Sequence, residues 1–186
     1  MTRMLYKWIM IDLLGWKIEG HFPRREDIPK YVVASAPHTS SWDLFLGLAT
    51  RSIDRASYIG FVGKKELFRF PIGPIMRWLG GYPVDRSRRS NYVDAVVDVF
   101  DQHKTFAICI APEGTRKRVA KLRSGFYWIA RKAGIPIVLT ALDYGNRVLR
   151  ISDPIYPTEN AEADIEQIVS FFRGVKGKNP ERGIHF

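Results

Sequence analysis

The sequence predicts an α/β fold: a single domain spanning residues 1–186, with a mixed, largely parallel sheet flanked by helices. The first observation behind this prediction is that short runs rich in β-branched and aromatic residues alternate with stretches of helical periodicity. The second is that several of these runs lack polar alternation, as strands buried on both faces do. The third is that no repeat, low-complexity tract or flexible linker divides the chain, whose length suits one domain.

The strand and helix predictions follow the chain in order. Strands are expected at Tyr31–Ser35, Tyr58–Val62, Tyr82–Val84, Thr105–Ile110, Ile137–Leu142 and Val148–Ile151. Helices are expected at Ser41–Ser52, Pro74–Leu79, Ser90–His103, Phe126–Ala133 and Ala161–Phe172. In folds of this class, ligands bind where loops leave the carboxyl ends of strands. The loops that begin at Pro37 and Pro112 are predicted to occupy that position.

Residues 1–20 are rich in apolar side chains but are interrupted by Lys7 and Asp12. The segment is too short and too charged to span a bilayer, and it lacks the small-residue cleavage site of a signal peptide. As a helix, it would place its cations on one side and most of its large apolar residues broadly opposite. It is therefore expected either to lie on an anionic membrane surface or to pack on the protein's own core.

The charge balance favours anionic partners. The chain has 29 Lys and Arg residues against 19 Asp and Glu residues, a formal charge of +10. Such a charge attracts nucleic acid, acidic lipid surfaces, phosphorylated substrates or acidic carrier proteins. The single cysteine, Cys109, excludes an internal disulfide and any multi-cysteine metal site. Because apolar residues flank it, we interpret Cys109 as a buried strand residue rather than a catalytic thiol.

A histidine and an aspartate lie on either side of the start of the helix predicted at 41–52. His38 follows the preceding strand, and Asp43 lies in the first helical turn. From that turn the carboxylate can reach back to the imidazole, fix its tautomer and leave the other ring nitrogen free to take a proton from a hydroxyl. The same pattern is also typical of an acid that complements the helix dipole beside an incidental loop histidine.

Two further interpretations of this segment use other side chains. Ser40 or Ser41 could act as a nucleophile, but neither lies in a Gly-x-Ser-x-Gly elbow, and with Thr39 they are ordinary helix-capping residues. A metal site would add Glu113 to the histidine and aspartate, although zinc sites usually have more His or Cys ligands than this.

A glycine-bearing loop and a run of cations follow the strand predicted at 105–110. Residues 112–132 contain seven Lys or Arg and one Glu. Gly114 lets the backbone turn closely around a ligand, and Arg116 can hold a phosphate through two parallel hydrogen bonds. The alternative is a tight turn followed by a solvated basic face.

Two other predicted strand ends also carry cations. Gly80–Arg86 ends in the pair Asp85 and Arg86, and Lys64 follows another strand. Each could direct a cation into the same pocket at the sheet edge. Alternatively, Asp85 and Arg86 pair with each other and Lys64 is solvated.

Taken in order, these segments resemble the motif series of the glycerolphosphate and lysophosphatidate acyltransferase family. The family's Asn-His-x4-Asp motif matches His38 and Asp43. Its glycine-to-arginine motif matches Gly80–Arg86, its Pro-Glu-Gly-Thr-Arg motif matches Pro112–Arg116, and its apolar strand with a proline matches Ile135–Val138. The resemblance covers residues 37 to 138.

Lys64 also resembles a basic position that the family places between its first two motifs. Two positions depart from the family pattern: Pro37 stands where Asn is usual, and Ala111 stands where Phe is common. Neither departure removes a catalytic group.

The resemblance implies a glycerolphosphate-acyltransferase-like fold and an O-acyltransferase that needs no cofactor and no metal. His38, oriented by Asp43, would deprotonate the hydroxyl of a lysophospholipid such as 1-acylglycerol-3-phosphate. That hydroxyl would attack the thioester of acyl-CoA or of an acidic acyl carrier protein. The residues that the resemblance assigns to the head-group phosphate are Lys64, Arg86, Glu113, Gly114, Thr115 and Arg116. A lipid acceptor implies a cytoplasmic protein peripherally associated with an anionic membrane surface, the inner face of the cell membrane.

Two other parts of such a site are expected from the sequence. Helix-N-terminal amides near Thr39–Ser41 are expected to stabilise the oxyanion. The aromatic-rich stretch Phe68–Leu79 is one candidate lining for an acyl-chain groove, and ordinary core packing is its alternative.

The rival interpretation is a basic module that binds nucleic acid or another anionic ligand without catalysis. Lys and Arg would contact phosphates, and Phe126, Tyr127 and Trp128 would stack on bases. This interpretation explains the charge but leaves His38 and Asp43 without a function. With the family resemblance, no nucleic-acid partner is expected.

Overall fold

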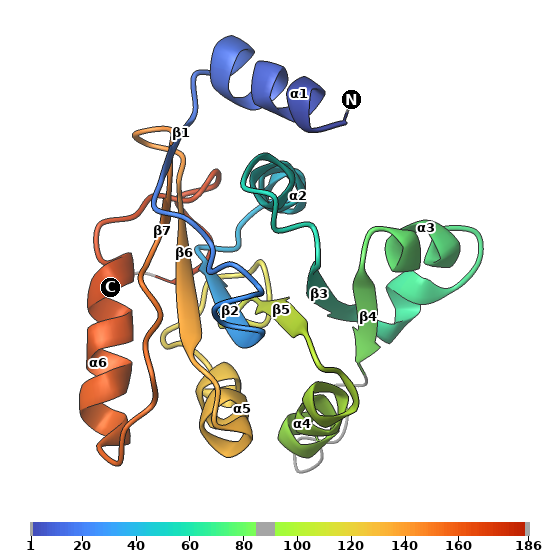
Figure 1. The fold of residues 1–186 in the computed structure, drawn as a ribbon. Coiled ribbons are helices and arrows are strands. Elements are labelled where there is room, and N and C mark those ends of the chain that lie inside the picture. Colours follow the sequence, from blue (N-terminus) through green and yellow to red (C-terminus); the bar gives the residue numbers. More distant parts are fainter. Residues whose placement is uncertain (1, 85–91, 185–186) are drawn as a thin grey trace.

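The computed structural model describes residues 2–84 and 92–184. Within these residues, seven strands form one sheet in the order β1-β7-β6-β2-β5-β3-β4 (Figure 1). The strands are β1 (Lys17–Glu19), β2 (Lys30–Ala36), β3 (Ile59–Lys64), β4 (Gly81–Val84), β5 (Phe106–Ile110), β6 (Ile137–Asp143) and β7 (Val148–Ile151). Every neighbouring pair from β6 to β4 is parallel, whereas β7 is antiparallel to β6 and parallel to β1. The predicted α/β class with a largely parallel sheet is confirmed.

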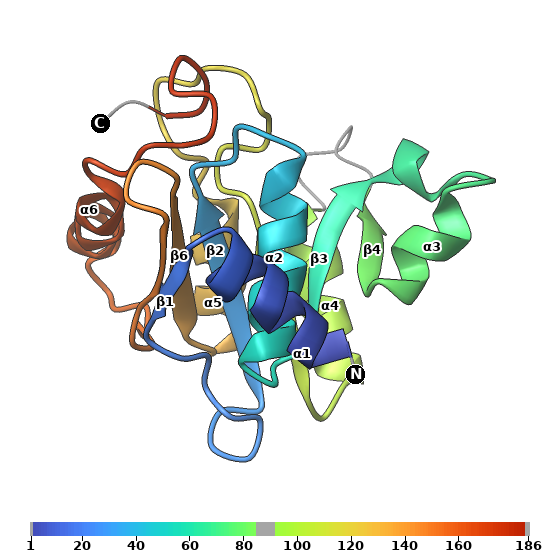
Figure 2. The same ribbon diagram turned by 90° about the horizontal axis from the view of Figure 1, so that it is seen from above.

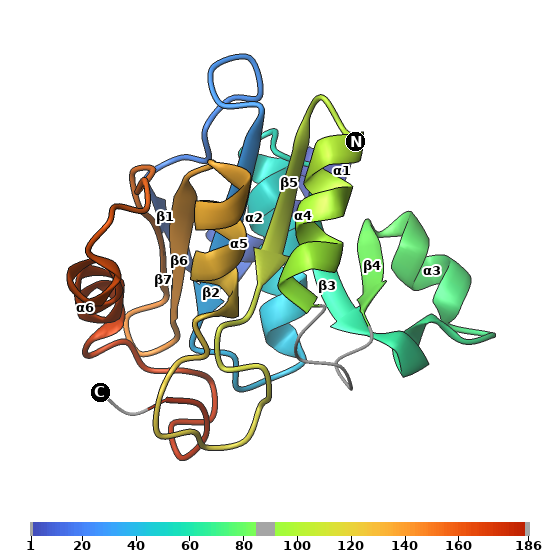
Figure 3. The same cartoon turned by 90° about the horizontal axis from the view of Figure 1, so that it is seen from below.

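Helices cover both faces of this sheet. They are α1 (Thr2–Lys7), the π-helix η1 (Trp8–Leu13), α2 (Trp42–Ile53), the 3-10 helix η2 (Lys65–Phe68), α3 (Gly73–Trp78), α4 (Tyr92–Gln102), α5 (Gly125–Ala133) and α6 (Ala161–Phe172). In Figure 1, α1 and α2 lie on one face, and α4 and α5 lie on the other. Figure 3 shows α4 and α5 in front of the sheet, with α6 at the side near β7 and the η2–α3 connection at the opposite side.

Two hydrophobic clusters, one on each face, hold the helices to the sheet. Alternate residues of β2 point to opposite faces, as the period of a strand requires: Val32 and Ala34 join the cluster under α4, α5 and α6, whereas Tyr31 and Val33 join the cluster under α2. Because both faces are covered, the central strands need apolar residues at every position. This explains why the runs in the sequence lack polar alternation.

The predicted helices and strands agree with the observed ones to within about two residues at each end, the usual uncertainty of such boundaries. The sequence analysis missed β1. This strand has only three residues, Lys17–Glu19, at the edge of the sheet, and a partly buried Ile18 stands between two exposed charged residues. Its pairing with β7 comes from tertiary packing rather than from a local pattern.

The N-terminal segment packs on the core along one side and exposes apolar residues on the other. Met10 is fully buried and Trp16 nearly so, in the same cluster as α2, and Arg3 Nε donates to the Ile53 carbonyl at 2.9 Å. Leu5 and Trp8 remain more than half exposed. The single helix considered for residues 1–20 would place Trp16 on the same side as Leu5 and Trp8, but Trp16 lies beyond the end of η1 and is buried. No described helix combines the length and apolar character needed to cross a bilayer.

Cys109 lies within β5, as predicted, and packs against the cluster under α2. Burial raises the pKa of its thiol to about 12, so the thiol is protonated at neutral pH. The residue therefore behaves as a small apolar side chain.

Shortening the buried side chain at position 10 tests whether the N-terminal segment is part of the core. Met10→Ala should lower the free energy of unfolding by about 2–4 kcal/mol, because it leaves a cavity in a packed cluster. Leu5→Ala, on the exposed side of the same segment, should change it by less than about 0.5 kcal/mol. Urea denaturation measures both values. Equal, small effects would show that the segment does not pack on the core in solution.

Candidate active site

The loops after β2 and β5 meet at one edge of the sheet. Because β2 and β5 are parallel neighbours, their carboxyl ends lie side by side and bring residues 37–41 and 111–124 together. Figure 2 shows these loops near the amino end of α2, and the segment before the C-terminus lies against them. This is the position predicted for ligand binding.

His38 and Asp43 form a hydrogen-bonded pair at this edge. His38 Nδ1 lies 3.1 Å from Asp43 Oδ2. The Asp43 side chain is 3% exposed, whereas the His38 side chain is 27% exposed. The carboxylate is therefore enclosed by protein, and the imidazole reaches the surface.

The Asp43 carboxylate accepts further hydrogen bonds that keep it ionised. The amides of Thr39 and Ser40 each donate to Oδ2 at 2.8 Å, and the Tyr144 hydroxyl donates to Oδ1 at 2.7 Å. Burial by itself would raise the pKa of Asp43, but hydrogen bonds from His38, the Ser40 amide and Tyr144 hold that pKa below its usual value. An ionised Asp43 favours the tautomer of His38 with the proton on Nδ1.

The amino end of α2 differs from the sequence expectation in one respect. Ser41, the residue before the helix, makes no capping hydrogen bond through its side chain; the aspartate one turn later reaches back to the amides instead. The amides of Thr39 and Ser40 are thus engaged by Asp43. These two amides are therefore not available as the oxyanion donors expected in this loop.

Arg116 lies on the open side of the imidazole. Its Nε is 3.4 Å from His38 Nε2, and its Nη1 donates to the Ser41 hydroxyl at 2.9 Å. A donor facing Nε2 is compatible only with an unprotonated Nε2, which agrees with the proton lying on Nδ1. His38 Nε2 is therefore the ring nitrogen on the exposed side of the site, and Arg116 is its neighbour there.

Glu113 is buried beneath the His38 loop. Its side chain has no exposed surface; one carboxylate oxygen accepts the His38 amide, and the other accepts the Ile184 amide at 3.0 Å. Burial raises the pKa of Glu113, and the two amides oppose that rise. The sequence analysis assigned this carboxylate to the head-group phosphate, but in the structure it points inward and ties together three chain segments.

The other predicted phosphate residues take different places. Gly114 adopts a φ of +67°, which favours glycine, and the Thr115 hydroxyl accepts the Lys117 amide at 3.2 Å. Lys64 ends β3 at the same edge of the sheet, but its side chain is not among those described. Arg86 lies outside the described residues.

Two parts of the site were not found by sequence reasoning. One is Tyr144, the donor to Asp43 from the loop after β6. The other is the segment 176–184: Asn179 Nδ2 donates to the Thr39 carbonyl at 2.9 Å, and a side chain at Gly177 would collide with Thr39. No local pattern marks these contacts, because they join residues more than 100 positions apart.

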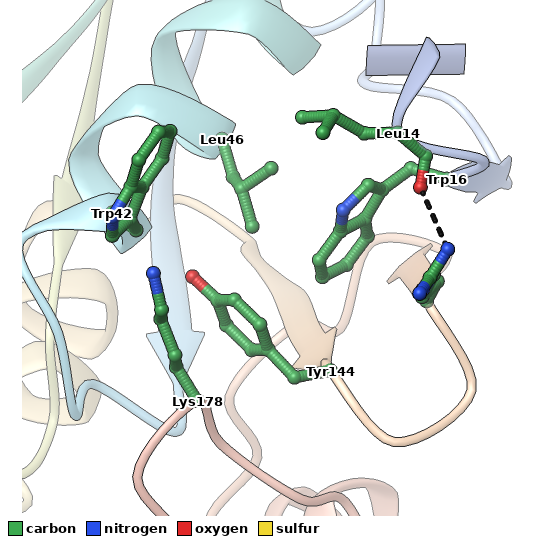
Figure 4. Close-up of a pocket in the computed structure, with 7 residues that line it drawn as sticks. Leu14, Trp16, Trp42, Leu46, Tyr144 and Lys178 are labelled. Carbon is green, nitrogen blue, oxygen red and sulfur yellow. Dashed lines mark hydrogen bonds between the residues drawn. The ribbon is translucent and has the colours of Figure 1, made fainter. Parts of the chain in front are cut away.

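A pocket of about 220 Å³ opens beside Tyr144, the donor to Asp43. Its lining residues are Leu14, Trp16, Trp42, Leu46, Tyr144, Arg147 and Lys178 (Figure 4). Tyr144 belongs both to this pocket and to the Asp43 network, and Lys178 Nζ lies 4.5 Å from the Trp42 ring centroid. The pocket is mainly apolar with cations at its rim, so it suits a chain that joins an apolar part to an anionic group.

Comparison with a second pair shows what distinguishes His38 and Asp43. His21 Nδ1 lies 2.7 Å from Asp54 Oδ1, a shorter distance, but the His21 side chain is 85% exposed. Among the hydrogen bonds described, the His21 ring makes only the one to Asp54. His38 thus differs from His21 in the lower exposure of its ring, 27%, and in the neighbouring Arg116.

The structure does not favour the alternative sites. Phe126 and Tyr127 are buried, and the Tyr127 hydroxyl donates to Asp164 at 2.8 Å, so these two rings cannot stack on nucleic-acid bases. Among the described residues, no cluster of three His, Cys, Asp or Glu side chains is arranged to hold a metal ion.

Comparisons with known proteins identify the family and the fold. A family model described as Acyltransferase matches residues 20–142, which include His38, Asp43 and Arg116. The fold is similar to the crystal structure of the 1-acyl-sn-glycerophosphate (LPA) acyltransferase PlsC from Thermotoga maritima. That match has a TM-score of 0.63 and 22% sequence identity, and it covers 91% of this chain and 74% of the other. Comparison with curated protein sequences gives no significant match.

Removing the buried carboxylate tests whether Glu113 supports the loop. Glu113→Ala should lower the free energy of unfolding by about 2–4 kcal/mol, because two buried amides lose their acceptor. Glu181→Ala, which removes an exposed carboxylate paired with Arg182, should change it by less than about 0.5 kcal/mol. Chemical denaturation of both variants gives the comparison. If Glu113 only contacted substrate, the Glu113→Ala variant without substrate would be as stable as the wild type.

Proposed function

The chain belongs to the acyltransferase family, and on that premise we propose that it moves a fatty acyl group from an acyl thioester to the hydroxyl of a lysophospholipid. 1-Acylglycerol-3-phosphate is the acceptor that the motif resemblance favours, and acyl-CoA or an acyl carrier protein is the donor. The observation that carries the proposal is the His38 imidazole, which a buried carboxylate holds at Nδ1 and whose Nε2 lies on the exposed side beside Arg116.

In the proposed reaction, His38 Nε2 takes the proton from the acceptor hydroxyl while the hydroxyl oxygen attacks the thioester carbonyl. The tetrahedral intermediate collapses, the carbon–sulfur bond breaks, and the thiolate takes the proton back from the imidazolium. Asp43 stabilises the imidazolium between these steps, which its lowered pKa supports. None of these reaction steps requires a covalent acyl-enzyme.

Arg116 is the residue that we propose for the acceptor phosphate. Its guanidinium is exposed and lies 3.4 Å from His38 Nε2, so a phosphate held there keeps the acceptor's hydroxyl close to the base. Gly114 and Thr115 lie in the same loop and complete this part of the proposal. Lys64 and Arg86 remain predicted phosphate contacts.

The pocket beside Tyr144 is our proposed site for part of an acyl chain. Its floor includes Trp16 and Leu46, and its rim carries Arg147 and Lys178. An apolar chain would bury its surface against the floor, and the rim cations would face the acidic donor or the head group. The +10 charge of the whole chain supports attraction of both anionic substrates.

Because the proposed acceptor is a membrane lipid, we propose that the protein works at an anionic membrane surface. Peripheral association with the inner face of the cell membrane fits the net charge and the exposed apolar residues of the N-terminal segment, Leu5 and Trp8, beside Arg3 and Lys7.

Substitution of the pair tests the proposed chemistry. His38→Ala and Asp43→Asn should each lower kcat for thioester-dependent acylation by about 10²–10⁴-fold, because the base or its orienting charge is lost. Release of coenzyme A with a panel of lysophospholipids measures the rate. His21→Ala, in the exposed pair, serves as the matched control and should retain wild-type activity. Equal coenzyme A release by wild type and variants would contradict the mechanism.

Removal of one hydroxyl tests the role of Tyr144. Tyr144→Phe takes a donor from ionised Asp43, so the pKa of Asp43 rises and the carboxylate is protonated at a higher pH than in the wild type. The acid limb of the kcat/KM profile should shift to higher pH, with a loss of less than about tenfold at neutral pH. Tyr156→Phe, at an exposed ring, should leave the profile unchanged. An unshifted acid limb would exclude coupling between Tyr144 and the base.

A further inference from the structure

The η2–α3 segment, residues 65–78, projects from the edge of the sheet between β3 and β4 (Figure 2). Its apolar side chains face outward to an unusual extent: Phe70 is 90% exposed and Trp78 is 84% exposed. Leu67, Ile72 and Ile75 are each about half exposed. These residues therefore do not take part in the core packing that the sequence analysis considered for this stretch.

The frame that carries these side chains is firmly packed. Phe68 is buried, and a side chain at Gly73 would collide with the Phe68 carbonyl, since its Cβ would lie 2.1 Å from that oxygen. Arg77 Nη1 donates to the same carbonyl at 3.1 Å, and Arg51 Nη2 donates to the Leu79 carbonyl at 2.6 Å. The exposed residues thus cannot turn inward without breaking this packing, so their apolar surface calls for an external partner.

Cations are interleaved with the apolar residues. Lys65, Arg69 and Arg77 line a second pocket, of about 400 Å³, together with Phe68 and Pro83. The sequence of the segment contains one acidic residue, Glu66. Clustered aromatic side chains beside Lys and Arg are typical of surfaces that lie in the head-group region of an anionic bilayer. The core of a protein–protein interface is instead depleted in charge.

We propose that the η2–α3 segment is a membrane-docking surface for anionic bilayers. Phe70, Ile72 and Trp78 enter the boundary between head groups and acyl chains, and Lys65 and Arg69 contact lipid phosphates. The segment starts directly after β3, whose carboxyl end lies at the same sheet edge as His38, so docking brings the active-site edge near the bilayer. The role of docking in acyl transfer rests on the proposed function, whereas binding of the segment to a bilayer does not require catalysis.

Vesicle binding by the full chain tests the surface directly. Wild-type protein should co-sediment with vesicles of phosphatidylglycerol and phosphatidylcholine, and Phe70→Ser/Trp78→Ser should weaken partitioning at least about tenfold. Trp128→Ser/Tyr156→Ser, which removes exposed aromatic rings elsewhere, should stay within about twofold of the wild type. Lys65→Gln/Arg69→Gln should weaken binding to anionic vesicles while leaving the weaker binding to pure phosphatidylcholine vesicles unchanged. Circular dichroism confirms that each variant is folded.

Several outcomes would overturn the proposal. These are a wild type that does not bind anionic vesicles, a Phe70→Ser/Trp78→Ser variant that binds as well as the wild type, or loss of binding only in Leu5→Ser/Trp8→Ser. A wild-type dimer that Phe70→Ser/Trp78→Ser converts to a monomer without loss of vesicle binding would assign the surface to a second copy instead.

Activity measurements separate this proposal from the proposed function. With lysophospholipid dispersed below its micelle concentration, Phe70→Ser/Trp78→Ser should release coenzyme A at the wild-type rate, whereas with vesicle-embedded acceptor its rate should fall. A failure of acyl transfer by the wild type and by every variant would refute the proposed function, and the vesicle-binding result would still stand.

Discussion

The buried carboxylate of Asp43 is the constraint around which the rest of the site is arranged. An ionised group that is 3% exposed is stable only when several donors surround it, and here the donors come from two amides, a phenol and an imidazole. These donors belong to the loop after β2 and the loop after β6. Satisfying one charge therefore fixes the relative positions of two strands, the start of α2 and the His38 ring.

A second buried carboxylate holds the same loop from the other side. Glu113 accepts the His38 amide, so the residue between Pro37 and Thr39 is held both at its backbone and at its ring. The pKa values of the two carboxylates are shifted in opposite directions. Asp43 has a pKa below its usual value, whereas burial dominates at Glu113 and raises its pKa. One is suited to stabilising an imidazolium, and the other to supporting a loop.

Six of the seven strands and the His38–Asp43 pair were predictable because their signals are local, whereas β1 has no such signal. Continuous apolar runs mark β2, β5 and β6, and the spacing of His38 and Asp43 follows from the geometry of a helix start. The resemblance to the acyltransferase family, carried by motifs of a few residues each, is confirmed by the family model over residues 20–142. Parallel pairing of β2 with β5 then brings Arg116 to the histidine, which the fold class already implied.

What could not be predicted depends on contacts between distant parts of the chain. The sequence places Glu113 beside an arginine in a loop, but whether the carboxylate faces solvent or the amide of His38 is decided by packing. Tyr144 lies two residues beyond the matched family segment, and its partner is 101 positions away. The exposure of Phe70 and Trp78 has the same origin, since an apolar run looks alike in sequence whether it points inward or outward.

The contacts made by residues 176–184 also determine when, during synthesis of the chain, the His38 loop obtains its full set of hydrogen bonds. Thr39 and Glu113 obtain part of their hydrogen bonding from Asn179 and Ile184, which the ribosome adds long after the histidine has emerged. The strands of the sheet and α2 precede this segment in the chain, but the loop that carries His38 has its full set of hydrogen bonds only when the late segment lies against it. A growing chain that stops short of residue 184 therefore lacks part of the hydrogen bonding that supports the His38 loop.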